Sequence, residues 1–159
     1  MNKIIKRINL IFATVLIITG CSYEPIFKQK NYNFEINEIS FFGEKDTNKI
    51  IKNRLNLIKK SNDKIKRKFN ISIETKKNKK VISKNTRGDP LKFELVLTGN
   101  YIVQENNNVL IDRKITKQYT YDNNSDKFKL EQSEAIILEN LSEQISNIII
   151  SSIINLNDS

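Results

Sequence analysis

Cys21 carries the only thiol in a chain of 159 residues. A thiol can act as a nucleophile, a metal ligand, half of a disulfide or an acylation site, and its surroundings select among these. A single cysteine excludes an internal disulfide. The chain also contains no histidine, which excludes histidine-based triads, Cys–His relays and histidine-ligated zinc. The residues around Cys21 therefore decide what its thiol does.

The segment before Cys21 has the layout of an export signal. Lys3, Lys6 and Arg7 come first, and Ile8–Ile18, a mostly apolar stretch of 11 residues, follows. A bilayer takes roughly 20 apolar residues to span, so this stretch suits a cleaved signal peptide. The chain is therefore expected to be exported.

Ile18-Thr19-Gly20-Cys21 resembles the lipobox of bacterial lipoproteins, in which an aliphatic residue, a small residue and Gly or Ala precede an obligatory cysteine. That resemblance implies a signal peptide over residues 1–20 and a palmitoylated, membrane-anchored N-terminus at Cys21. Ser22 resembles the outer-membrane sorting pattern of that family. A plain signal peptide with an incidental cysteine, or a short membrane anchor, is the alternative.

A second group of side chains with binding chemistry is basic: Lys76, Lys77, Lys79, Lys80 and Arg87. Ammonium and guanidinium groups bind phosphates, and each is worth roughly 1 kcal/mol near an anionic lipid surface. We predict that the four lysines lie in a polar connection between strands and bind an anionic lipid. The alternative is a solvated loop that only keeps the protein soluble. A second, weaker cluster is Lys64, Lys66, Arg67 and Lys68.

The overall charge agrees with an anionic partner. The net charge is +9, and the three basic residues of the signal segment account for three of these, which leaves +6 on the mature chain. Export removes nucleic acid as a partner and leaves anionic lipid. Lys, Asn and Ile are abundant throughout, so compositional bias explains part of this charge. No pair of carboxylates or glycine-rich phosphate loop stands out, so no enzyme, metal or cofactor is expected.

The elements that must position these residues follow from apolar periodicity. After a tether at 21–31, residues 32–159 form one domain with the order strand, helix, three strands, helix, over about 32–42, 46–60, 69–74, 93–103, 109–121 and 127–155. The first strand changes phase near Asn37–Glu38, which indicates a bulge. Two amphipathic helices can cover one face of a four-stranded sheet, so the expected fold is an α+β two-layer sandwich.

Several positions are expected to face the core of this sandwich. The first helix presents Ile51, Leu55 and Ile58 at helical spacing. The last helix has a stripe of Leu138, Leu141, Ile145, Ile148 and Ser152, widened by Ile137, Ile149 and Ile153. On the last strand, one parity is shared by Val109, Ile111, Ile115, Tyr119 and Tyr121.

The order of these elements resembles the lipopolysaccharide-assembly lipoprotein family LptE, in its alphaproteobacterial branch. Cys21 and Tyr23-Glu24-Pro25-Ile26-Phe27 are similar to its opening Cys-Gly-aromatic-Arg-Pro-Leu-aromatic, with Ser and Glu in place of Gly and Arg. Ile51-Lys52-Asn53-Arg54-Leu55 is similar to its first helix, and Phe93-Glu94-Leu95 through Tyr101-Ile102-Val103 to its long third strand.

That resemblance implies a non-enzymatic function. Members of the family sit inside and beside the LptD β-barrel of the outer membrane, facing the periplasm, and help move lipopolysaccharide to the outer leaflet. An LptD-type barrel and lipopolysaccharide are then the expected partners, with no cofactor. The residues expected to bind lipopolysaccharide are Lys76, Lys77, Lys79, Lys80 and Arg87. The competing interpretations are a free-standing periplasmic binding or inhibitor lipoprotein, and an exported hydrolase that uses carboxylates alone.

The lipobox interpretation predicts that Cys21→Ala abolishes labelling by radioactive palmitate and leaves the domain able to fold, because only the acylated atom is lost. Labelling of membrane fractions and circular dichroism of the purified variant measure the two outcomes. Persistent labelling would place the acyl chain elsewhere.

Overall fold

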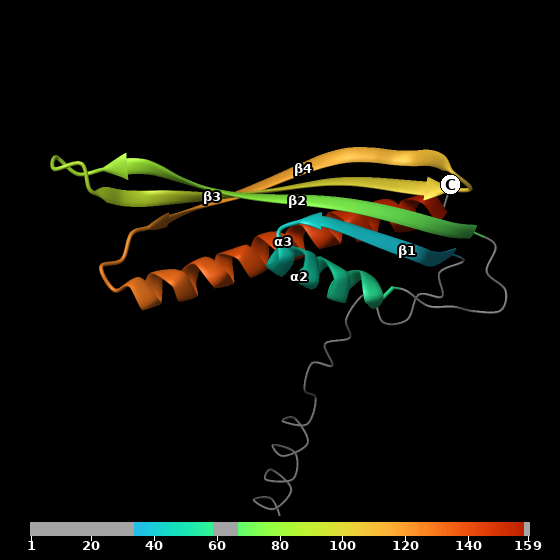
Figure 1. Ribbon diagram of the computed structural model, residues 1–159, viewed down its shortest axis with the longest axis horizontal. Coiled ribbons are helices and arrows are strands. Elements are labelled where there is room, and N and C mark those ends of the chain that lie inside the picture. The colour runs from blue at the N-terminus through green and yellow to red at the C-terminus, as the bar shows by residue number, and fades with distance from the viewer. Residues whose placement is uncertain (1–33, 59–66, 158–159) are drawn as a thin grey trace, which may run out of the picture.

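The computed structural model describes residues 34–58 and 67–157. In chain order the elements are β1 (Phe34–Gly43), α2 (Lys45–Asn56), β2 (Arg67–Lys84), β3 (Pro90–Glu105), β4 (Asn108–Asp122) and α3 (Lys127–Asn157). The strands form one four-stranded sheet, and both helices lie on the same face of it (Figure 1). This is the predicted α+β sandwich of two helices on a four-stranded sheet. Two sets of predicted residues lie outside the described ranges: the signal peptide and tether at residues 1–31, which include Cys21, and Lys64 and Lys66 of the second basic cluster.

The sheet is mixed, in the order β1-β2-β3-β4. β1 runs parallel to β2, with α2 as the crossover that a parallel pair requires, and the other two pairs are antiparallel. The register shifts between Ile36 and Glu38, which confirms the predicted bulge. Asn106 and Asn107 turn β3 into β4 with φ values of 50° and 67°, a left-handed conformation that asparagine tolerates better than most residues.

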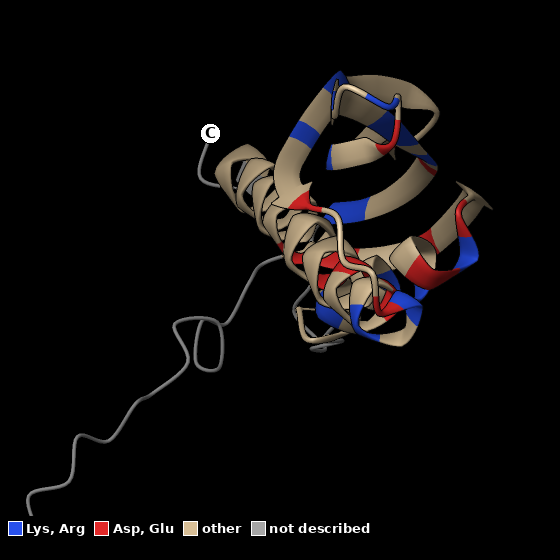
Figure 2. Cartoon of the chain, turned by 90° about the vertical axis from the view of Figure 1, so that its left-hand side faces the viewer, with Lys and Arg blue, Asp and Glu red and all other residues tan. Residues whose placement is uncertain are grey.

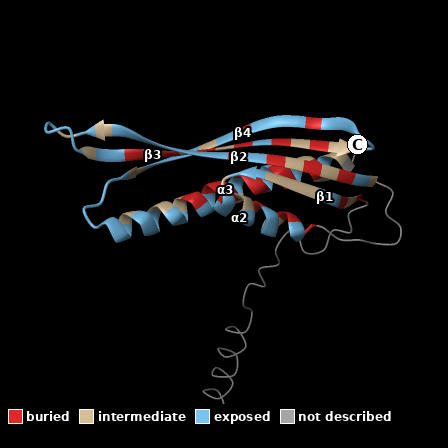
Figure 3. Ribbon diagram, viewed as in Figure 1, coloured by how far each residue is buried: buried red, intermediate tan, exposed pale blue. Residues whose placement is uncertain are grey.

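The core lies between the helices and the adjoining half of the sheet (Figure 3). Alternate residues of β2 and β3 point into it, and α2 contributes Ile51 and Leu55 as predicted. The helix ends at Asn56, earlier than the predicted end near residue 60, and Ile58 is buried just beyond it. The buried residues of the strands are Phe34, Ile36, Phe69, Ile71, Ile73, Leu95, Leu97, Tyr101, Val103, Ile111 and Ile115. Burying one such aliphatic or aromatic side chain contributes about 1.5–3 kcal/mol.

Three of the predicted core positions are wrong. Val109 is 56% exposed, because a register shift after Val103 pairs it with Gln104 and turns it away from the core. Tyr119 is 54% exposed on the edge strand, and Ile148 is 36% exposed. Ile149 and Ile153 of the predicted stripe are buried, and Ser142, Ser146 and Ile150 complete the buried face of α3.

α3 packs closely against β3 at Gly99. A Cβ atom at Gly99 would lie 3.2 Å from Cγ2 of Ile145, tighter than an ordinary van der Waals contact. About two helical turns after Ile145, Oγ of Ser152 accepts a hydrogen bond of 2.9 Å from the hydroxyl of the buried Tyr101. The absence of a side chain at Gly99 therefore lets the helix lie directly on β3.

Thr75 of β2 holds the start of α2. Its buried hydroxyl accepts a hydrogen bond from the backbone N–H of Glu44 at 3.0 Å and lies 2.8 Å from Oδ1 of Asn48, to which it donates. The helix begins at Lys45, next to the predicted start at about residue 46. The cap comes from a neighbouring strand, because Thr75 satisfies a backbone donor that the helix leaves unpaired.

β2 continues well past the predicted strand end, so the expected connection at Lys76–Lys80 is wrong. These residues pair with β3 in regular antiparallel register, from Lys76 opposite Thr98 to Lys80 opposite Glu94. The turn lies instead at residues 85–89, where the side-chain carbonyl of Asn85 accepts the backbone N–H groups of Arg87 and Asp89. We call residues 76–98 the distal hairpin. Most of it is exposed, because α2 does not extend over it (Figure 3).

Two glycines with positive φ provide a matched test of the β1–β2 junction. Gly43 has φ of +88°, and a Cβ there would lie 1.9 Å from the carbonyl oxygen of Thr75, whereas Gly88 has φ of +89° with open space around it. Gly88→Ala should cost about 1–2 kcal/mol of unfolding free energy, the strain of a left-handed alanine. Gly43→Ala should cost clearly more, because β1 must also move away from β2.

Urea unfolding followed by circular dichroism measures both variants. Equal losses at the two positions would show that β1 moves without cost at its end.

Candidate anion-binding surface

Strand alternation divides the predicted lysine cluster between two faces of the sheet. Lys77 and Lys79 share the helix-facing side with the buried Thr75, and Lys76 and Lys80 point to the open side. Nζ of Lys77 lies 3.5 Å from a carboxylate oxygen of Glu44. The four lysines are therefore neighbours in the sequence but do not lie on one surface of the sheet.

Lys79 belongs to a cluster that joins the distal hairpin to α3. Its ammonium group forms an ion pair with Glu134 and lies 4.2 Å from the ring centroid of Phe93. The Tyr121 hydroxyl donates a hydrogen bond of 2.7 Å to the same Glu134 oxygen, and the rings of Phe93 and Tyr121 are 5.7 Å apart. Burial raises the pKa of Tyr121, and the hydrogen bond and charge of Glu134 raise it further. The charge of Lys79 is thus used within the fold.

Lys76, Lys80 and Arg87 remain available to a ligand. All three are exposed, and none forms an ion pair with another residue in the described ranges. Figure 2, which faces the end of the molecule that carries the distal hairpin, shows Lys and Arg positions distributed around the curved strands. Lys84 adds a further exposed cation at the end of β2.

Exposed apolar side chains lie among these cations. Val81, Ile82 and Leu91 are 43%, 47% and 47% exposed, and all three belong to the distal hairpin. The sequence analysis missed them because all three lie between the strands predicted at about 69–74 and 93–103. Apolar side chains flanked by exposed lysines fit an amphiphile with an anionic head better than a soluble anion.

The second predicted cluster is used in part to close the opposite end of the sheet. Arg67 makes two hydrogen bonds of 2.9 Å to the Glu105 carboxylate and donates a third to the Leu156 carbonyl. The pairing raises the pKa of Arg67 and lowers that of Glu105. Lys68 lies 3.9 Å from Glu35. Arg67 therefore joins β2, β3 and α3, and the described part of this cluster has no unpaired cation.

A groove of about 520 Å³ lies beside the Lys79 cluster, between the distal hairpin and the start of α3. Its lining includes cations and acids together, Lys79, Lys127, Glu131 and Glu134. Within residues 34–58 and 67–157, no three acidic or cysteine side chains gather to hold a metal ion, and neither helix is long and apolar enough to cross a membrane. Because the groove contains Glu131 and Glu134, the open face of the distal hairpin is the better candidate for binding an anion.

The class of protein that shares this fold is a group of small bacterial lipoproteins. No family model and no curated protein matches the sequence, so the relationship rests on three-dimensional structure. Four similar solved structures are 12–19% identical to this chain, and similarity at this level establishes the common fold alone.

Three of these structures illustrate the similarity. Rare lipoprotein B from Shewanella oneidensis is 16% identical, with a TM-score of 0.53 over 76% of this chain and 98% of that chain. Lipoprotein B from Nitrosomonas europaea is 13% identical, with a TM-score of 0.57 over 83% and 92% of the two chains. A minor lipoprotein from Acinetobacter baumannii is 19% identical, with a TM-score of 0.50 over 72% and 91%.

The raised pKa of Tyr121 predicts a pH dependence of stability. The folded state binds the phenolic proton more tightly than the unfolded chain does, whose tyrosine pKa is about 10. The contribution of the protonated Tyr121 to the free energy of unfolding is therefore complete below about pH 10 and is lost as the pH rises above that value. Tyr121→Phe should flatten this alkaline decrease in unfolding free energy, measured by urea unfolding between pH 8 and 11.

Tyr119→Phe is the matched control, because its side chain is 54% exposed. An alkaline decrease that is the same in wild type and Tyr121→Phe would contradict the assignment.

Proposed function

We propose that this chain is an outer-membrane lipoprotein, anchored through Cys21 and facing the periplasm, that partners an LptD-type β-barrel in the assembly and transport of lipopolysaccharide. The observation that carries the proposal is the fold, which extends over 91–98% of three solved lipoproteins. The lipobox-like Ile18-Thr19-Gly20-Cys21 supports the same class independently of the fold.

The distance from the anchor to the fold suits a partner in the same membrane. Cys21 precedes Phe34, the first residue of β1, by 13 positions. Such a segment reaches at most about 45 Å when fully extended. The domain therefore stays close enough to the membrane to dock continuously with a barrel embedded there, and the lipid raises its effective concentration at the barrel.

The distal hairpin is the part of the domain that we assign to lipopolysaccharide. Lipid A combines phosphates with acyl chains, and the hairpin combines the unpaired Lys76, Lys80 and Arg87 with the exposed Val81 and Ile82. Arg87 can bind a phosphate with two hydrogen bonds, and each lysine contributes a point charge. Lys77 and Lys79, which are ion-paired within the fold, have a positioning role in this scheme.

Affinity purification of the full chain from the membranes of its host tests the barrel partnership. Recovery of one large outer-membrane β-barrel at a stoichiometry near one to one is the expected result. A monomer recovered without a barrel would overturn the proposal and favour a free-standing binding lipoprotein.

Lipopolysaccharide binding is tested with a triple variant, Lys76→Gln, Lys80→Gln and Arg87→Gln, of the purified full chain. At roughly 1 kcal/mol per cation near an anionic lipid, loss of all three should weaken binding at least tenfold. The matched control is Lys45→Gln, Lys49→Gln and Lys52→Gln on α2, which are exposed and remove the same charge. Equal binding by the two triple variants would reject the distal hairpin as the site.

A further inference from the structure

β4 is an edge strand whose outer side no described strand covers. It pairs with β3 without interruption from Ile111 to Asp122, and it contains neither proline nor glycine. An edge of this kind presents a row of backbone N–H and C=O groups that can accept another strand. β1, at the other edge, is shorter and is interrupted by its bulge. β4 is therefore the better template for strand addition.

The charges on β4 select the strand that can be added. Arg113, Lys114 and Lys117 lie within its regular stretch, and none forms an ion pair with another described residue. Like charges on neighbouring strands are destabilising and opposite charges are stabilising. A second copy of β4 would bring like charges together. The chain's own residues 22–33 carry Lys28 and Lys30 against the single Glu24, so they are disfavoured as well.

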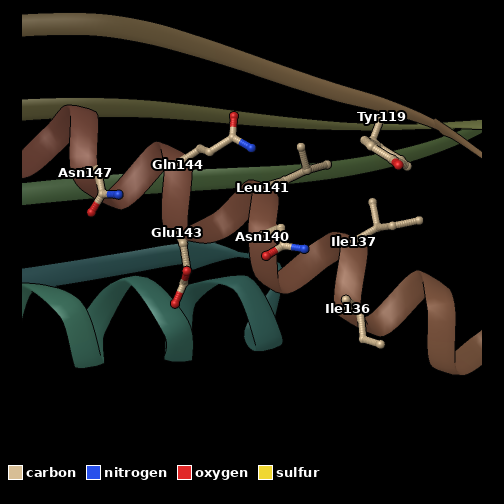
Figure 4. Close-up of a pocket in the computed structure, with 8 residues that line it drawn as sticks. All are labelled: Tyr119, Ile136, Ile137, Asn140, Leu141, Glu143, Gln144 and Asn147. Carbon is tan, nitrogen blue, oxygen red and sulfur yellow. The ribbon is translucent and has the colours of Figure 1, made fainter. Parts of the chain in front are cut away.

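A groove of about 410 Å³ runs beside β4, between Tyr119 and α3 (Figure 4). Leu141 and Gln144 point from the helix toward the strands, and Tyr119 lies above Ile137. The groove thus has apolar side chains at its base, where alternate side chains of an added strand could be buried.

Three amide side chains of α3 give this groove hydrogen-bonding capacity. Asn140, Gln144 and Asn147 are four and three residues apart, a spacing that places them along one helix face. None of them forms a side-chain hydrogen bond to another residue in the part of the chain that the structure describes. Each amide can both donate to and accept from a peptide group, so the three together match the polar backbone of an extended chain.

From the open edge, the unpaired cations and the amide-lined groove, we infer that β4 accepts an extended acidic segment of a partner protein as a fifth strand. The backbone of the segment pairs with β4. Because alternate residues of a strand face opposite sides, its side chains on the helix-facing side meet Arg113 and Lys117 and enter the groove beside Tyr119, and its side chains on the open side meet Lys114. This surface is separate from the distal hairpin, and the inference does not depend on the identity of the barrel or on lipopolysaccharide.

The test uses two fluorescein-labelled 12-residue probe peptides, one of alternating Glu and Val and one of alternating Lys and Val, with the purified full chain in detergent. Fluorescence anisotropy should show binding of the acidic peptide and at least tenfold weaker binding of the basic one. A triple variant, Arg113→Glu, Lys114→Glu and Lys117→Glu, should reverse this preference. The matched control Lys45→Glu, Lys49→Glu and Lys52→Glu on α2 changes the net charge equally and should preserve it.

Hydrogen exchange distinguishes strand addition from general charge attraction. Bound acidic peptide should protect alternate backbone amides of β4, those that face away from β3, and leave α2 unchanged. Protection of these amides without peptide, in a self-associated state or in the monomer, would overturn the inference by assigning the edge to a second copy or to residues 22–33. Unprotected β4 amides, or equal effects of the two triple variants, would also overturn it and would leave the barrel partnership untouched.

Discussion

The close packing of α3 on β3 determines which parts of this molecule form the core and which remain surface. Gly99 lets Ile145 lie against the strand, and the core residues of all four strands gather around that contact. Beyond the ends of the helices, the sheet continues without a covering element among the described residues. The distal hairpin and the edge groove beside β4 both lie at the limits of the helix layer, so one packing constraint defines the core and leaves both candidate binding surfaces exposed.

The distribution of ion pairs follows from the same arrangement. Cations that face a neighbouring element form ion pairs with an acid of that element. Arg54 pairs with Glu143 between the helices, Arg67 with Glu105 between strands, and Lys79 with Glu134 between sheet and helix. Cations that face solvent, such as Lys76 and Lys114, have no such partner among the described residues. Position in the fold thus separates charges that hold elements together from charges that can meet a ligand, a distinction that charge counts in the sequence do not make.

Periodicity predicted those elements that have one buried face and one exposed face. The strand through Leu95, Leu97 and Tyr101 and the helix stripe of Ile51 and Leu55 are of this kind. The bulge of β1 was also visible, as a change of phase. The two-layer architecture followed from these elements.

The remainder depended on contacts between residues distant in sequence. Lys76 to Lys80 show no alternation, because both faces of the strand are exposed there, and their strand pairing is set by β3 residues opposite them. The cap on α2 comes from Thr75, 31 residues away from Glu44. Val109 was misassigned because a single register shift reverses the face of every residue beyond it. The division of the lysine cluster could therefore be seen only after the strand had been recognised.

The two-residue turn at Asn106 and Asn107 has a consequence for the order in which the chain folds. Closing so short a loop has a small entropic cost, and β2, β3 and β4 are consecutive neighbours, so this three-stranded meander is expected to form early. β1 must find β2 across the whole of α2 and is expected to join last. β1, the first strand of the described fold, would then be the final one to dock, after the meander has formed.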